Sequence, residues 1–420
     1  MLGSFWLLIT VLLSLASLIL HQASLLLVAL LFFLAGGVAR LWGRYCLNRV
    51  EYRRRLSTTR VFFGEEIQLE IEVANRKPLP LPWIQIEDEI PDEVTLLRGK
   101  TSLSYRPPRR LLTNLLSLAW YHKITRRYPM RCLQRGFFTF GPGRIRSGDL
   151  FGFFSREIEI THEDYLMVYP KIVPLEKLGI TSRQPLGEIL TRRHIFPDPV
   201  LTLGVRDYHF GDSLKRIHWK TSARVGQLQT KVAETTTTID MGIFLDVRTI
   251  KPPLWGSVPE LLELGVITAA SMANHVLDAG YRVGLYVNQS KRLDDELIRL
   301  PPSQHTDQLR YILEALAQVH ATETTPIARL VLQESRNLSW GSSLVVISAV
   351  PTDALLSTLA NMKRVGRRVV LILVGGAELS TNQDGLTVYN VRDDVLPDEL
   401  EPLAMKKHRL HLESGGESGK

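Results

Sequence analysis

The chain has 420 residues, which is long enough for two or three domains that each bury a hydrophobic core. Its formal net charge of +8 and pI near 9.4 suit an anionic partner, either nucleic acid or the inner face of a bilayer. Only two cysteines occur, Cys46 and Cys132. These features argue against a single-domain protein and against a disulfide-stabilised fold.

Two uncharged apolar runs open the sequence, over residues 2–20 and 24–39, and only His-Gln-Ala separates them. Each run is close to or slightly below the roughly 20 residues that cross a bilayer, so we expect a shallow or tilted membrane hairpin over 1–45. A cleaved signal peptide is the alternative. A signal peptide agrees less well with the sequence than a membrane hairpin does, because no basic segment precedes the first run and the second run continues where a cleavage site would lie.

Arginines follow the second apolar run, whereas the connector between the runs has no Lys or Arg. They are Arg40, Arg44, Arg49, Arg53, Arg54 and Arg55. Arginines beside a membrane span favour the cytoplasmic side, because anionic lipids hold them there and their transfer across the bilayer is costly. We therefore predict two transmembrane segments in the cell membrane, with the soluble domains in the cytoplasm. The same cluster explains part of the basic pI without any nucleic acid.

Short alternating runs fill residues 46–170. Ile67, Leu69, Ile71 and Val73 alternate with polar residues, which is the period of a half-buried strand. Clusters of Pro and Gly separate such runs, as turns do. This pattern predicts a small antiparallel β-sandwich, followed by a linker over 171–203.

Apolar strands alternate with amphipathic helices from residue 239 onward. We expect strands at 239–247, 282–288, 342–350 and 367–376, and helices at about 257–279, 304–319 and 352–365. This alternation predicts an α/β domain over 239–398 with a parallel sheet covered on both faces. Ligands of such sheets bind at the carboxyl ends of the strands, where Asp246 and the residues after Ile347 lie. The polar tail, 399–420, is predicted to be flexible.

A long motif occupies the segment 204–238. It has the form R-x-Y-x-x-G-D-x-x-R-x-I-[DH]-W-x-x-[ST]-A-R, and the matching residues are Arg206, Tyr208, Gly211, Asp212, Arg216, Ile217, His218, Trp219, Ser222, Ala223 and Arg224. On this motif the chain resembles the bacterial domain-of-unknown-function 58 family. The resemblance implies a multidomain protein with a transmembrane helical hairpin, a β-sandwich-like middle domain and a C-terminal von Willebrand factor A-like (Rossmann-like) α/β domain. Members are often encoded beside MoxR-type AAA+ ATPases and transglutaminase-like membrane proteins, which implies an adaptor near the cell envelope.

The resemblance also raises the question of a metal ion, because many von Willebrand A domains hold a divalent cation with a D-x-S-x-S loop. Here Arg248 and Ile250 follow Asp246 where hydroxyl ligands would stand, and Ala349 replaces an acidic residue in a later loop. Thr306 offers a single hydroxyl, whereas Mg²⁺ needs several oxygen ligands. We expect a degenerate site without metal or other cofactor, in which Arg248 pairs with Asp246.

Three functions compete for the motif. Asp212 with His218, or Ser213 as a nucleophile, would make the protein an uncharacterised hydrolase, but the spacing matches no known nucleophile context. Basic residues around Trp219 could bind nucleic acid, but acidic residues interrupt the basic field. A structural and interaction role agrees best with the residues of the motif. Asp212 or Ser213 would cap a short helix, Leu214 and Ile217 would pack inward, and the arginines would bind carboxylates.

We therefore expect a membrane-anchored interaction protein and do not expect catalysis or nucleic-acid binding. Its expected partners are the lipid bilayer and a MoxR-type AAA+ ATPase, with a transglutaminase-like membrane protein as a further candidate. The motif would form a clasp between the sandwich and the α/β domain, followed by a strand that leads into the sheet. A metal-dependent adhesion-type module and the hydrolase using Asp212 and His218 are the alternatives.

Overall fold

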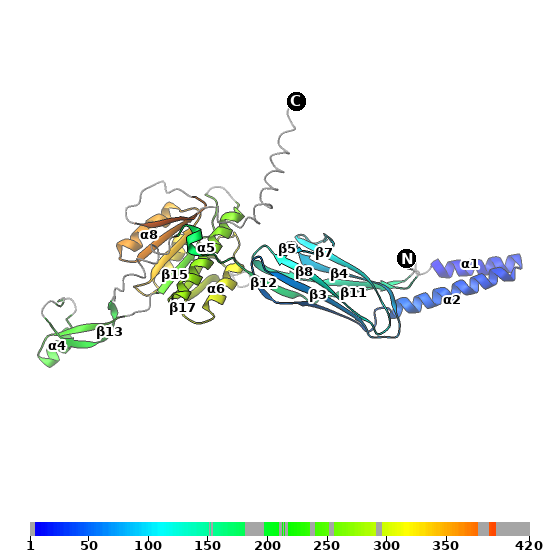
Figure 1. The fold of residues 1–420 in the computed structure, drawn as a ribbon, viewed down its shortest axis with the longest axis horizontal. Coiled ribbons are helices and arrows are strands. Elements are labelled where there is room, and N and C mark those ends of the chain that lie inside the picture. Colours follow the sequence, from blue (N-terminus) through cyan, green and yellow to red (C-terminus); the bar gives the residue numbers. More distant parts are fainter. Residues whose placement is uncertain are drawn as a thin grey trace, which may run out of the picture. The chain divides into compact units, whose positions relative to one another are not determined.

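The computed structural model describes most of the chain (Figure 1). The described residues are 5–150, 152, 154–180, 197–209, 212, 214, 217–235, 240–251, 256–290, 296–376 and 386–391. Gly211, Arg216 and the predicted tail, 399–420, lie outside them. The chain divides into two compact units, Met1–Tyr169 and Pro170–Lys420.

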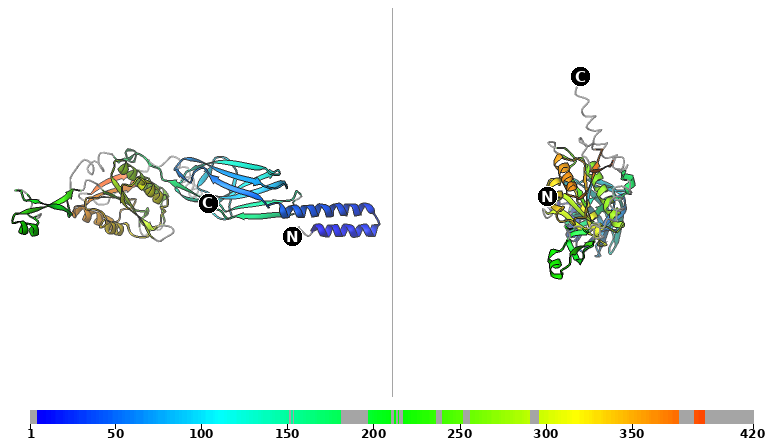
Figure 2. Two further views of the ribbon diagram at one scale, coloured as in Figure 1. Left: turned by 90° about the horizontal axis from the view of Figure 1, so that it is seen from below. Right: turned by 90° about the vertical axis from the view of Figure 1, so that its left-hand side faces the viewer.

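The first unit begins with two helices, α1 (Phe5–Leu20) and α2 (Ala23–Tyr45), which run side by side and antiparallel (Figure 2). Small residues allow the close approach, since a Cβ atom on Gly36 would lie 2.3 Å from Cε3 of Trp6. Most other apolar side chains of the pair are exposed. Helix α2 is long and apolar enough to cross a membrane, and α1 is shorter.

The strands of the same unit form the predicted β-sandwich. They are β1 (Val50–Leu56), β2 (Arg60–Phe62), β3 (Glu66–Asn75), β4 (Leu81–Pro91), β5 (Val94–Leu96), β6 (Thr101–Leu103), β7 (Arg109–Leu118), β8 (Lys123–Cys132), β9 (Gly136–Phe140), β10 (Gly143–Gly148), β11 (Ser155–Ile160) and β12 (Asp164–Tyr169). The sheet orders are β1-β3-β8-β5, β11-β10-β4-β7-β6 and β2-β12-β9. The described pairings are antiparallel except for β2 with β12.

The alternating run on β3 is confirmed, because Ile67, Leu69, Ile71 and Val73 are all buried. One arginine of the basic cluster that follows the second apolar run has a structural role. Arg54 is buried in the sandwich, where its Nη1 lies 3.2 Å from Oδ1 of Asp88 and its Nε lies 2.7 Å from Oδ2 of Asp164. Arg54 points inward because strand residues alternate between the two faces and its partners lie on facing strands.

The second unit opens with a short 3₁₀ helix, η2 (Leu175–Leu178), and with strand β13 (Pro197–Asp207). The predicted linker over 171–203 therefore contains ordered elements. After β13 come helix α4 (Trp219–Val225) and strand β14 (Gln229–Thr235), and then a six-stranded sheet. Its strands are β15 (Asp240–Leu245), β16 (Arg282–Ser290), β17 (Leu297–Ser303), β18 (Ser343–Ser348), β19 (Arg368–Val374) and β20 (Thr387–Val391), in the order β17-β16-β15-β18-β19-β20.

The sheet is mixed rather than parallel, because β17 runs antiparallel to β16. β16 ends at Ser290 and β17 begins at Leu297. The short connection between them cannot make the crossover of a dozen or more residues that a parallel pair requires, so the chain turns back.

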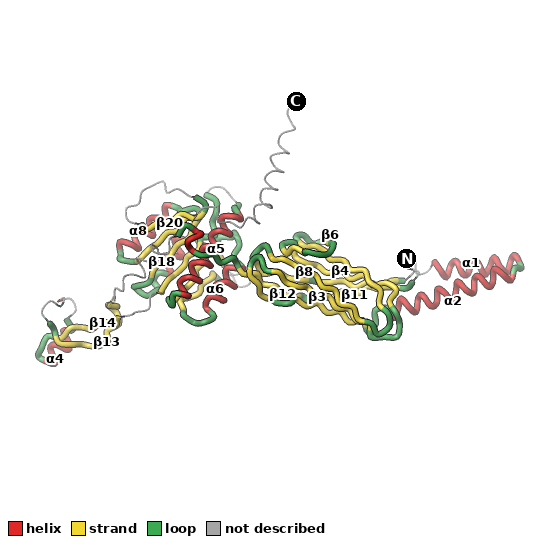
Figure 3. Tube along the Cα trace, viewed as in Figure 1, coloured by secondary structure: helices red, strands yellow, loops and turns green. Residues whose placement is uncertain are grey.

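Helices cover both faces of the sheet (Figure 3). Helix α5 (Pro259–Asp278) packs with α6 (Gln308–Ala317), and α7 (Ile327–Glu334) packs with α8 (Asp353–Arg364). Alternation along β15 separates the two cores, since Phe244 belongs to the cluster with α7 and α8 whereas Leu245 faces Gly265 of α5. The predicted helices α5, α6 and α8 are confirmed, and α7 was not predicted.

Candidate functional site

The first candidate site lies at the carboxyl edge of the α/β sheet. Asp246 directly follows β15, Asn288 lies near the end of β16 and Ser348 ends β18. All three side chains are buried. The strand order reverses between β15 and β18, which is the position where open α/β sheets usually bind their ligands.

Hydrogen bonds within the protein occupy both carboxylate oxygens of Asp246. Oδ1 accepts from the side-chain amide of Asn288 at 2.8 Å and from the backbone N–H of Arg248 at 3.1 Å. Oδ2 accepts from the hydroxyl of Ser348 at 2.8 Å. The amide of Asn288 is itself fixed, because its oxygen accepts from the backbone N–H of Val247 at 2.9 Å. The network is therefore closed by neutral donors.

The expected ion pair between Arg248 and Asp246 is wrong. The guanidinium of Arg248 binds Glu323 instead, with Nε 2.8 Å from Oε2 and a second bond from Nη2 to the same oxygen. The carboxylate of Asp246 is buried, and neutral donors already occupy both of its oxygens. The longer side chain of Arg248 is partly exposed to solvent. Glu323 lies in the connection between α6 and α7. It belongs to no recognisable sequence motif, and the folding of the chain places it at this site.

Burial changes the acidity of this site. Removal from water raises the pKa of Asp246 to about 6, although the hydrogen bonds from Ser348, Arg248 and Asn288 lower it in part. Nearby Glu323 adds a smaller upward effect on the same pKa. Asp246 is therefore a buried acid that titrates in a mildly acidic range.

The residues at this edge do not fit the divalent cation of a von Willebrand A site. The oxygens of Asp246 already accept hydrogen bonds, and the Arg248 guanidinium is bound close by. Ile250 and Ala349 offer no side-chain oxygen. Thr306 lies at the opposite edge, because it follows the antiparallel β17, and Gln304 beside it donates to the carbonyl of Gly280. Among the described residues, no group of three His, Cys, Asp or Glu side chains could hold a metal ion.

The second candidate site is the motif itself, which folds as a unit that we call the signature arm, β13-α4-β14 (197–235). The two strands pair antiparallel with each other, with Arg206 opposite Thr230 and Asp207 opposite Gln229. Among the described strands they form a sheet of their own rather than joining the six-stranded sheet. The predicted extended run at 228–234 is confirmed as β14, but its pairing partner is β13.

Asp212 fastens the tip of the signature arm. Its Oδ1 accepts from Nη2 of Arg206 at 2.7 Å, and its Oδ2 accepts from the backbone N–H of His209 at 3.1 Å and from the hydroxyl of Thr230 at 3.4 Å. The hydrogen bonds from His209 and Arg206 hold the pKa of Asp212 below its usual range. The expected bond between an arginine and an acidic residue of the motif is therefore present at Arg206.

His218, rather than Asp212, caps the short helix α4, and Ser213 lies outside the described residues. The Nδ1 of His218 accepts from the backbone N–H of Thr221 at 3.1 Å, because the helix begins only at Trp219. The hydroxyl of Ser222 donates to the carbonyl of His218 at 3.0 Å and accepts from the N–H of Gln229 at 2.8 Å. Ser222 thus joins α4 to β14.

Asp212 and His218 make separate sets of hydrogen bonds, so the pair that the hydrolase alternative requires is not formed by the described contacts. Tyr208 is half-buried and bonds through its backbone to the carbonyl of Leu228 at 2.9 Å. Arg224 is exposed in the last turn of α4. Among the described residues of the motif, Asp212, His218 and Ser222 therefore form their hydrogen bonds within the arm.

Apolar side chains are left on the outside of the signature arm. Ile217 is buried as expected, but Leu214 is 66% exposed, so its predicted inward packing is wrong. Trp219 is 67% exposed, and Val225 is exposed further along α4. Lys220 adds a cation beside them. The arm combines an internally bonded frame with an exposed aromatic and basic surface.

These features define a class of protein with an apolar helical pair, a β-sandwich and a mixed α/β sheet that carries a two-stranded arm. Residues 204–393 match the family model described as "Protein of unknown function DUF58", and this part of the chain belongs to that family. The resemblance drawn from the motif is thus confirmed. A relative, "Uncharacterized protein YeaD" of Bacillus subtilis (strain 168), is 25% identical over 356 residues, which cover 81% of this chain and 80% of that protein.

Solved structures resemble about a quarter of the chain. A non-cellulosomal cohesin from Archaeoglobus fulgidus is 11% identical, covers 28% of this chain and 91% of that chain, and has a TM-score of 0.20. The collagen-binding domain from a Staphylococcus aureus adhesin is 10% identical, covers 28% of this chain and 96% of that chain, and has a TM-score of 0.19. The β-sandwich rests on the strand pairings described above rather than on these likenesses.

Proposed function

We propose that this chain is a membrane-anchored interaction protein whose signature arm binds a partner protein. One observation carries the proposal. Asp212 and Ser222 of the motif form their hydrogen bonds within the arm, whereas Leu214 and Trp219 remain exposed. An exposed tryptophan beside cationic residues has the composition of a binding hot spot.

The anchor in this proposal is the N-terminal helical pair. Helix α2 crosses the cell membrane, and α1 forms a second, shorter membrane segment. The N-terminus then lies on the same side of the membrane as the β-sandwich. Arg40 and Arg44 are exposed near the end of α2. They favour the cytoplasmic side for the sandwich and the α/β domain.

The α/β domain is of the von Willebrand A type in this proposal, but it works without a cation. Support comes from its strand order and from the hydrogen bonds that close the site at Asp246. The expected partner is a MoxR-type AAA+ ATPase, and a transglutaminase-like membrane protein is the further candidate. Because the exposed Lys220 and Arg224 lie on the same short helix as Trp219, the partner's docking surface should be acidic.

The test measures binding of the full chain, held in nanodiscs, to a purified MoxR-type ATPase encoded in the same genome. Trp219→Ala should weaken binding by about 30-fold, the effect of losing a hot-spot residue worth about 2 kcal/mol. Trp340→Ala removes an exposed tryptophan elsewhere in the same unit and should leave affinity within about threefold. Equal losses in both variants, or no binding of the wild-type chain, would overturn the proposal.

A further inference from the structure

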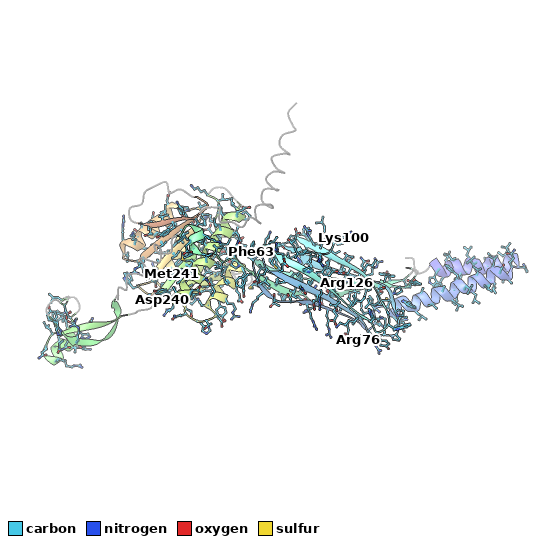
Figure 4. The ribbon with its side chains drawn as sticks, viewed as in Figure 1. Phe63, Arg76, Lys100, Arg126, Asp240 and Met241 are labelled. Carbon is cyan, nitrogen blue, oxygen red and sulfur yellow. The ribbon has the colours of Figure 1, made fainter. Side chains whose placement is uncertain are left out.

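One end of the β-sandwich gathers the loops that surround the C-terminal end of α2. The backbone N–H of Arg76 donates to the carbonyl of Arg49 at 3.0 Å, and that of Asn75 donates to the carbonyl of His122 at 2.9 Å. The indole of Trp83 donates to the carbonyl of Asp149 at 3.0 Å. Figure 4 places Arg76 at this end and Phe63 at the opposite end of the sandwich.

Helix α2 is joined firmly to these loops. The buried ammonium of Lys77 donates to the carbonyls of Cys46 at 2.5 Å and Asn48 at 2.8 Å. A Cβ atom on Gly43 would lie 2.6 Å from the Cβ of Phe154, so the helix backbone touches the loop after β10 directly. These contacts therefore fix the position of the sandwich loops along the axis of α2.

A cavity of about 540 Å³ shows how far the loops reach along α2. Helix residues Val38 and Trp42 line it together with Leu118, Ala119 and Leu150 of the sandwich. Val38 comes two positions before Arg40, the first charged residue of α2. When α2 spans the bilayer, this level lies at the boundary between the acyl chains and the headgroups.

The tips of these loops carry side chains that suit such a boundary. Trp120 is 65% exposed, Leu150 is 71% exposed, and Tyr121 is exposed beside Trp120. Tryptophan and tyrosine are enriched at membrane interfaces because their rings are apolar with one polar group. Cationic side chains are suited to lipid phosphates. Exposed arginines at this end include Arg40, Arg44, Arg49, Arg76 and Arg156, of which Arg76 also pairs with Glu51 at 3.2 Å and Arg156 donates to Asn48.

We propose that this end of the sandwich is a membrane seat, formed by Trp120, Tyr121 and Leu150, which enters the interfacial layer of the bilayer. An acyl chain of a bilayer phospholipid packs into the apolar cavity between α2 and the loops, while the surrounding arginines bind anionic headgroups. The inference rests on the membrane anchoring proposed above and is independent of the partner of the signature arm. The seat would hold the sandwich against the membrane by contacts beyond the helical anchor.

The test places an environment-sensitive fluorophore at single cysteines in the full chain, reconstituted in nanodiscs of phosphatidylcholine and phosphatidylglycerol. The seat variants are Trp120→Cys and Leu150→Cys. Matched controls are Leu103→Cys and Tyr105→Cys, which replace exposed side chains near the start of β7, whereas Trp120 follows the end of that strand. Native Cys46 and Cys132 are buried, and the wild-type chain reports any background labelling. Leu30→Cys in α2 reports on the anchor itself.

Two quenchers give the result, a doxyl group near the top of the lipid acyl chain and iodide in the aqueous phase. Labels at positions 120 and 150 should be quenched by the doxyl lipid at least about threefold more than labels at 103 and 105, as expected for side chains at the acyl boundary. If they are instead quenched like the controls while the Leu30→Cys label is quenched by lipid, the seat is overturned and the anchor stands. If the Leu30→Cys label is not quenched by lipid, the anchor fails and the seat fails with it.

Discussion

Asp246→Asn should remove a pH-dependent contribution to the free energy of unfolding of the α/β domain. Burial raises the pKa of Asp246 from an ordinary value of 3.8 to about 6. An acid with a higher pKa in the folded protein than in the unfolded chain binds its proton more tightly when folded. Its stabilising contribution is therefore complete below about pH 4 and is lost as the pH rises to about 6. At about 1.4 kcal/mol for each pH unit, the loss amounts to about 3 kcal/mol.

The asparagine can keep the geometry of the site. Its oxygen would accept from Asn288 and from the N–H of Arg248, and its amide would donate to Ser348, whose hydroxyl can turn to accept. The wild-type chain and the variant are unfolded in urea, in nanodiscs, at a series of pH values, and folded protein is measured by pulse proteolysis. Titration of the other groups cancels in the difference between the two free energies of unfolding.

The expected result is a change of about 2.5 kcal/mol in that difference between pH 4 and pH 7, because part of the full loss has already occurred at pH 4, with the wild-type chain relatively more stable at the lower pH. A difference that stays constant within about 0.5 kcal/mol over this range would refute the reasoning, because Asp246 would then titrate alike in the folded and unfolded states.

Three further changes test other parts of the fold. Arg54→Met leaves the buried carboxylate of Asp88 without its cation and should lower the free energy of unfolding by about 3–5 kcal/mol in urea titrations, whereas an unchanged midpoint would contradict the buried pair. Gly36→Leu forces a side chain into the ring of Trp6 and should separate α1 from α2, seen as lost cross-linking between cysteines placed on the two helices. Ser222→Ala leaves the N–H of Gln229 without its acceptor and should speed exchange of that amide by roughly 10- to 100-fold, with no change expected if the hydroxyl is not its partner.

The elements with strong periodicity were predictable from the sequence. The alternation on β3, the amphipathic pattern of α5 and the apolar runs of β15 and β18 each bury a face that local spacing already reveals. Helix α7 and strand β17 were missed. β17 contains two adjacent prolines and runs along the edge of the sheet, where the backbone need not donate a full set of hydrogen bonds.

The candidate site at Asp246 was predictable only in part. Asp246 and the residues after Ile347 follow apolar runs, so their meeting at one edge of the sheet follows from topology. The partner of Arg248 could not be inferred, because Glu323 lies 75 positions away and reaches the site through the connection between α6 and α7. The sequence neighbour Asp246 was the more obvious candidate, yet it is already satisfied by Asn288.

Apolar helices, a β-rich region and an α/β region are readable from the residues alone, because burial periodicity is a local property of the chain. The sequence also showed the family, since the motif is long and specific. The roles of the charged groups, in contrast, depend on how the chain folds. In the folded chain Arg54 is a core residue, Asp212 binds Arg206, and Trp219 is exposed to solvent. The reason is physical: the pairing of a charge and the exposure of a ring depend on which distant segments fold against them.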